Sequence, residues 1–108
     1  MTREEIHVGD KGTKLRVTIK ENDTAVDLTG ALTLQIYLEK PSGTVLTKTA
    51  TLENPPGVDG KIYWITTAFT DLDETGEWKI EGRVELASGD WVSSIDTFQV
   101  FKALVTRT

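Results

Sequence analysis

Apolar and polar residues alternate along three segments of this chain, residues 13–20, 32–39 and 77–86. Successive side chains of a β-strand point to opposite faces, so alternation with a period of two indicates a strand with one buried face. The apolar members of these segments are the side chains that we expect in the core: Leu15, Val17, Ile19, Leu32, Leu34, Ile36, Leu38, Trp78, Ile80, Val84 and Leu86. A chain dominated by this pattern is predicted to be all-β.

Tight turns separate these segments from one another. Glycine, proline, asparagine and aspartate favour turns, and they gather at residues 10–12, 21–23, 40–43 and 88–90. Strand candidates with less regular alternation lie at residues 6–8, 44–52, 61–66 and 91–101. About seven or eight short strands at such spacing are typical of a β-sandwich.

The last strand candidate changes the face on which its apolar residues lie. Trp91, Ser93 and Ile95 share one side of the alternation, whereas Phe98 and Val100 share the other. One extra residue in a strand reverses the alternation, so we predict a β-bulge near residues 93–94.

Two local features bear on how the strands are arranged. Gly82 interrupts the alternation of residues 77–86, and glycine inside a strand indicates a bulge or a close crossing of backbones. Glu74, Gly76 and Trp78 have the spacing of the corner that crosses between the sheets of immunoglobulin-like domains. The aromatic residue there is tyrosine in antibody domains, and tryptophan has only an N–H donor, so its hydrogen bond must differ.

The fold prediction follows from these patterns. We predict that residues 1–108 form one domain, an immunoglobulin-like β-sandwich of about seven or eight antiparallel strands. The segments outside the alternating strands, residues 1–9 and 103–108, are predicted to be short docking arms.

Composition narrows the classes of function. The net charge is −5, which disfavours nucleic acid and anionic membranes as partners, and the basic residues form no patch in the sequence. The chain has no cysteine, so disulfides and thiolate metal sites are excluded. No apolar run approaches the roughly 20 residues of a membrane span, and residues 1–5 lack a signal peptide's apolar stretch. We therefore expect a soluble protein made in a cytoplasm.

No motif with a catalytic mechanism is present, so we predict a protein that is not an enzyme and holds no cofactor. The single histidine, His7, is interpreted as a surface residue on an edge strand. Asp71, Asp73 and Glu74 lie close together, and calcium takes oxygen ligands of this kind. The pattern of a calcium-binding loop is absent, so we favour a role in capping turns over a metal site.

The aromatic residues are the best candidates for contacts with a partner. Tyr37 lies on the polar side of its strand, Tyr63 lies in a short aromatic strand, and Trp91 follows a turn. Exposed rings of this kind fill pockets on proteins or stack on sugars, although they also cover sheets without any binding role. A carbohydrate-binding or adhesin-like module is therefore an alternative function.

The order of motifs along the chain carries one further indication. The series is VGDKGTKLRVTI at 8–19, VDLTGA at 26–31, KPSGT at 40–44 and DGKIY at 59–63, followed by DLD, GEW, WVSS and FQV between residues 71 and 100. In this order the motifs resemble the N-terminal domain of the tailed-bacteriophage baseplate upper protein family, and short stand-alone phage proteins of the same type. The resemblance covers nearly the whole chain.

The resemblance implies a non-enzymatic virion protein with an immunoglobulin-like fold. Such a protein docks on other virion proteins in the tail, baseplate, neck or fibre attachment, and a capsid decoration protein is an alternative. The resemblance also implies repeated copies in a symmetric assembly and a place in the virion, after assembly in the cytoplasm of a host bacterium.

Overall fold

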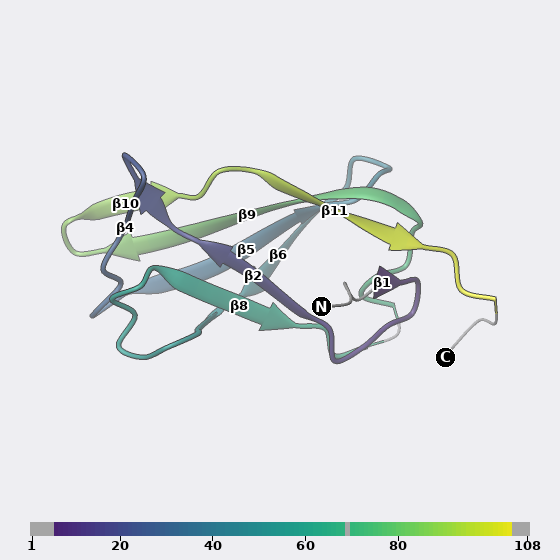
Figure 1. The fold of residues 1–108 in the computed structure, drawn as a ribbon, viewed down its shortest axis with the longest axis horizontal. Coiled ribbons are helices and arrows are strands. Elements are labelled where there is room, and N and C mark those ends of the chain that lie inside the picture. The colour runs from purple at the N-terminus through teal and green to yellow at the C-terminus, as the bar shows by residue number, and fades with distance from the viewer. Residues whose placement is uncertain (1–5, 69, 105–108) are drawn as a thin grey trace.

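The computed structural model describes residues 6–68 and 70–104 (Figure 1). Every regular element in these two ranges is a strand, which confirms the all-β prediction. The strands are β1 Ile6–His7, β2 Lys14–Thr18, β3 Lys20–Glu21, β4 Thr24–Ala25, β5 Thr33–Glu39, β6 Val45–Thr49, β7 Thr51–Leu52, β8 Lys61–Ile65, β9 Gly76–Leu86, β10 Gly89–Val92 and β11 Asp96–Phe101.

Six strands form the larger sheet. Their order is β1–β11–β9–β5–β6, and β10 pairs with the far end of β9. All these pairs are antiparallel except β1 with β11, which is parallel. Strand β9, with 11 residues, is the axis of the sheet because it pairs with β5 on one side and with β10 and β11 on the other.

Three strands form a smaller sheet in the order β2–β8–β7, and β3 pairs with β4 in a separate hairpin. Strands β6 and β7 are separated only by Ala50, which is buried. Because β6 pairs with β5 and β7 pairs with β8, this stretch of chain passes from the larger sheet to the smaller one at Ala50.

The two sheets lie across one another and share the core. Strand β2 crosses over β5 and β9 when the molecule is viewed down its shortest axis (Figure 1). We call the facing sides of the sheets their inner faces. The buried side chains come from both sheets and from the loops between them: Leu15, Val17, Ile19, Leu28, Ile36, Leu38, Ala50, Ile62, Leu72, Trp78, Ile80, Val84 and Val100.

Gly82 marks the closest approach of the two sheets. A Cβ atom at this position would overlap Val17 Cγ2 of β2, and it would lie 3.1 Å from the Ile19 side chain and 3.3 Å from that of Ile62. The interruption of the alternation in β9 is therefore a close crossing, one of the two predicted explanations.

The predicted bulge lies between β10 and β11. Val92 pairs with Arg83 and Asp96 pairs with Ile80, so three residues at 93–95 oppose two at 81–82. One extra residue reverses the alternation, as the sequence predicts.

One residue that we expected in the core, Leu32, is exposed, and so is Ile95 after the bulge. Ile95 follows the extra residue of the bulge and is 61% exposed, so the predicted face shared with Trp91 ends at Ser93. Leu32 is 67% exposed because it lies in a bend before β5 begins at Thr33, where the strand alternation does not yet apply. The prediction for Leu32 was wrong because alternation predicts burial only within a continuous strand.

The corner before β9 is built around Trp78. The Trp78 side chain is fully buried, and its indole Nε1–H donates a hydrogen bond to the backbone carbonyl of Glu74 at 3.0 Å. The indole therefore bonds to the backbone upstream through its only donor.

Candidate functional site

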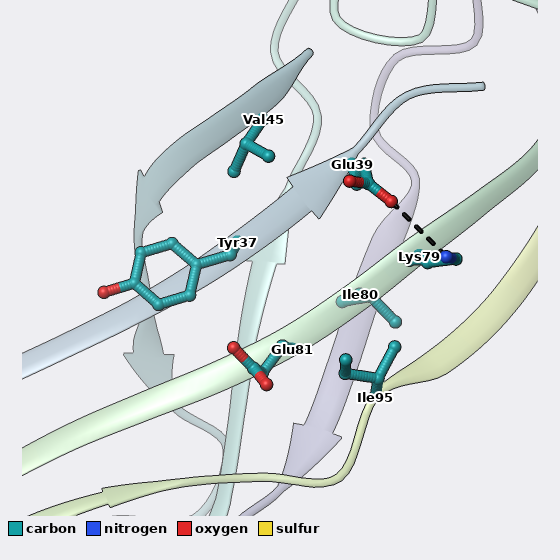
Figure 2. Close-up of a pocket in the computed structure, with 7 residues that line it drawn as sticks. All are labelled: Tyr37, Glu39, Val45, Lys79, Ile80, Glu81 and Ile95. Carbon is teal, nitrogen blue, oxygen red and sulfur yellow. Dashed lines mark ion pairs between the residues drawn. The ribbon is translucent and has the colours of Figure 1, made fainter. Parts of the chain in front are cut away.

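A shallow hollow lies on the outer face of the larger sheet (Figure 2). Its volume is about 370 Å³, and its lining residues are Tyr37, Glu39, Val45, Lys79, Ile80, Glu81 and Ile95. Val45 and Ile95 are 57% and 61% exposed, so this hollow contains aliphatic surface that no described residue covers. Most of the outward side chains around it are charged, which makes the apolar pair distinctive.

Strand register places these side chains together. Tyr37 of β5 is opposite Glu81 of β9, and Glu39 is opposite both Val45 of β6 and Lys79 of β9. The bulge between β10 and β11 then brings Ile95 to the same outer face, where Figure 2 shows it next to Ile80. The hollow therefore depends on the extra residue of the bulge.

The cations on this face are neutralised by its own acids. Lys79 Nζ lies 3.5 Å from Glu39 Oε1. The Arg83 guanidinium donates to Asp90, and its Nη1 donates to Gln35 Oε1 at 3.0 Å. Hydrogen bonding to Asp90 raises the pKa of Arg83 further above its ordinary value, so this side chain stays charged.

Three glutamates on β9 have no cationic partner among the described residues. Glu77, Glu81 and Glu85 alternate with buried residues of β9, so they lie on the outer face. No ion pair between described residues reaches any of them. We call the outer face of the larger sheet, with these three glutamates, the acidic face.

The outer face of the smaller sheet has the opposite charge. Lys14 and Arg16 of β2 alternate with buried residues, and Lys61 of β8 is opposite Thr18 in the register. Glu53 is the acid that pairs with two of these cations, at 2.7 Å from Lys14 Nζ and 3.5 Å from Arg16 Nε. We call the outer face of the smaller sheet, with Lys14, Arg16 and Lys61, the basic face.

The basic face continues into a polar groove beside β2. The groove has a volume of about 420 Å³, and the cations that line it are Arg16, Lys20 and Lys61. Asp96 is the acid in its lining. No basic patch was expected from the sequence, because these cations come together only through the pairing of β2 with β8.

The three predicted aromatic residues lie in three different places. Tyr37 lines the hollow, and its hydroxyl donates to Gln35 Oε1 at 3.0 Å. Tyr63 lies on the basic face, with Lys14 Nζ 4.3 Å from the centre of its ring. Trp91 packs against the edge of the core, and its Nε1–H donates to Glu21 Oε2 at 2.8 Å. The structure does not bring these rings together.

The predicted acids lie in turns and have partners there. Asp71 Oδ2 accepts from the backbone N–H groups of Thr67 and Ala68 at 2.7 and 2.9 Å. Asp73 Oδ1 pairs with Lys40 Nζ at 2.9 Å. Glu74 Oε1 and Oε2 accept from the backbone N–H and hydroxyl of Ser42, at 3.1 and 2.8 Å. Within residues 6–68 and 70–104, no three acidic or histidine side chains are grouped as a metal site would need.

The remaining predictions concern the ends of the chain. Of the predicted docking arms at 1–9 and 103–108, residues 1–5 and 105–108 lie outside the described residues, whereas Ile6 and His7 form β1 at the edge of the larger sheet. His7 is half-buried there, and its ring centre lies 6.1 Å from that of Phe101. No helix in the described part of the chain is long and apolar enough to cross a membrane.

Comparison with known proteins adds no relative. No protein-family model matches the chain, and no curated protein matches it. The resemblance to baseplate proteins therefore stays a prediction, and the two outer faces supply the structural observations that bear on function.

Proposed function

We propose that the chain is an immunoglobulin-like β-sandwich that serves as a non-enzymatic structural protein of a bacteriophage virion. In this proposal it docks on other virion proteins through the acidic face. The proposal rests on two observations. The resemblance of the motif series indicates the class of particle, and the hollow around Tyr37 is a candidate docking surface.

Three observations favour the immunoglobulin-like arrangement. The chain passes from the larger sheet to the smaller one between β6 and β7, as in sandwiches with Greek-key connections. Strand β1 lies parallel to β11 at the edge of the larger sheet. Trp78 bonds to the backbone at the corner before the central strand, where antibody domains have a tyrosine that bonds upstream.

The hollow is the observation that carries the docking function. Protein-binding surfaces commonly have an apolar centre with a charged rim. Val45 and Ile95 supply exposed aliphatic surface, while the ion pair of Glu39 with Lys79 lies at the rim. A volume of about 370 Å³ accommodates one or two apolar side chains of a partner.

The same hollow fits a protein better than a sugar. Sugar rings stack on exposed aromatic faces, and Tyr37 is the one aromatic residue of this lining. Tyr63 and Trp91 lie elsewhere, so they add no second stacking surface to the hollow. Carbohydrate binding is accordingly an outcome for the test to exclude.

The proposal is tested on particles released from cells that carry the gene. The wild-type chain is expected in purified particles at a fixed copy number by quantitative mass spectrometry. The double variant Val45→Lys/Ile95→Lys should fold and yet be lost from particles, because two ammonium groups enter the apolar hollow.

The matched control is Leu32→Lys/Val58→Lys, which alters two aliphatic residues that are 67% and 59% exposed outside the hollow. This control should enter particles normally. A wild-type chain that is missing from all particles, and whose tryptophan fluorescence responds to added glycans, would overturn the virion function in favour of the sugar-binding module.

A further inference from the structure

The two outer faces of the molecule are complementary in charge. The acidic face has three glutamates on β9 without a cationic partner among the described residues. The basic face has Lys14, Arg16 and Lys61, with Glu53 as the acid that pairs with the first two. A surface of one sign usually meets a surface of the other, because the pairing guides encounter and fixes register.

The apolar features of the two faces also correspond. The acidic face has the hollow with exposed Val45 and Ile95. The basic face has Tyr63, which is half-buried, and Ile65, which is 40% exposed at the end of β8. Each face thus combines apolar side chains with charges, which is the composition of a protein-binding surface.

We propose that the partner of the acidic face is the basic face of a second copy of this chain. The inference rests on the proposed docking function and deepens it, since it names what enters the hollow. Glu77, Glu81 and Glu85 face cations of the neighbouring copy, while Tyr63 and Ile65 of that copy cover Val45 and Ile95.

The positions of the faces determine the symmetry of the contact. The inner faces of the sheets pack on each other, so the two outer faces point in opposite directions (Figure 1). A copy that binds through one face therefore leaves the other face free for the next copy. Such a head-to-tail contact is heterologous, and it closes into a ring or grows into a filament.

The size of the faces allows a specific contact. The molecule measures 46 × 31 × 23 Å, and the outer faces are seen along its shortest axis. A stable interface buries about 800 Å² on each partner, which a face of these dimensions can supply. The net charge of −5 opposes the approach of two copies, so local complementarity has to exceed this general repulsion.

The first measurement is the mass of the purified full chain by sedimentation as its concentration is raised. The average mass should rise beyond that of a dimer, and added salt should reverse the rise because it screens the charge pairs. A monomer at every concentration in low salt would overturn the proposal. If that monomer is nevertheless found in particles, the docking function stands and the partner is a different protein.

Two variants each remove one face. Glu77→Gln/Glu81→Gln/Glu85→Gln neutralises the three unpaired glutamates of the acidic face, and Arg16→Gln/Lys61→Gln leaves the basic face with Lys14, which Glu53 pairs. Each is expected to weaken self-association by about tenfold or more when measured alone. When mixed, the two variants should form a 1:1 dimer and nothing larger, because only one native pair of faces remains between them.

Neutralisation of charges outside both faces is the matched control. Asp23→Asn lies in the turn between β3 and β4, and Lys102→Gln follows β11, so this double variant should associate like the wild type. Association that survives both face variants, or a mixture that fails to form the dimer while the wild type associates, would overturn the head-to-tail contact.

Discussion

The two sides of strand β9 have different tasks. Its inner side has Trp78, Ile80, Gly82 and Val84, all buried, and Gly82 is in close contact with the opposite sheet. Its outer side has five charged residues in a row: Glu77, Lys79, Glu81, Arg83 and Glu85. A change on the inner side has no room to be absorbed, whereas a change on the outer side meets water.

The difference between the two sides of β9 indicates which residues determine stability and which determine recognition. Inner-side substitutions should alter the free energy of unfolding, and outer-side substitutions should alter association while leaving that free energy nearly unchanged. The comparison breaks if any outer-side change unfolds the protein as readily as an inner-side one.

Replacing Trp78 should have the largest effect on stability. Trp78→Ala removes a fully buried ring and its hydrogen bond to Glu74, so we expect a loss of about 3–5 kcal/mol in urea unfolding. Lys79→Ala, one residue away on the outer side, should change the stability by less than about 0.5 kcal/mol, since its pair with Glu39 is exposed. Equal losses in the two variants would refute the comparison.

Adding one methyl group at Gly82 should have the next largest effect. Gly82→Ala forces the two sheets apart at Val17 and should cost about 1–3 kcal/mol, measured in the same way. Val17→Ala in the same molecule creates space at that contact, so the double variant should lose less than the sum of the single losses. Additive losses would mean that the contact between Gly82 and Val17 does not limit how closely the two sheets pack.

Removing the Ser93 hydroxyl tests the bulge that supports the hollow. Ser93 Oγ accepts from the buried N–H of Gly82 at 2.7 Å and donates to the carbonyl of Ser94 at 2.9 Å. Ser93→Ala leaves that N–H unsatisfied, so we expect a loss near the lower end of about 1–3 kcal/mol. Ser94→Ala is the control, because it removes an exposed hydroxyl and should leave unfolding unchanged.

Local sequence was enough to predict the inner side of the sheets. Alternation gave strands near β2, β5 and β9, and the reversal of alternation gave the bulge, because side-chain period and burial are linked within one strand. It placed Leu32 wrongly because Leu32 lies just before β5 begins at Thr33. The sequence placed the charged residues of β2 on one side of that strand. That Lys61 lies on the same face could be seen only from the register of β2 with β8.

Lys48 on the edge strand β6 shows why contacts between distant segments could not be predicted from the sequence. Lys48 alternates with exposed residues of β6 and is half-buried, with its Nζ 5.0 Å from the centre of the Trp64 ring and 4.0 Å from Asp71 Oδ1. These partners lie on β8 and in the loop before β9, so no local pattern links them to Lys48. An inward charge on an edge strand also discourages edge-to-edge pairing, which favours association through the faces.

The smallest expected effect concerns two carboxylates in loops, those of Asp27 and Asp59. The side-chain hydroxyl and backbone N–H of Thr29 lower the pKa of Asp27 below its ordinary value of 3.8, and hydrogen bonds from Asn54 and Lys61 do the same for Asp59. A lowered folded-state pKa means that the folded chain binds fewer protons than the unfolded chain. The stabilisation is therefore complete above the unfolded pKa and is lost as the pH falls through the folded one.

Asp27→Asn/Asp59→Asn should consequently flatten the loss of stability below about pH 4. Comparison of urea midpoints at neutral pH and at about pH 3 measures the difference, which should be small because both carboxylates are exposed to water. A variant that loses as much stability in acid as the wild type would assign the acid sensitivity to other carboxylates.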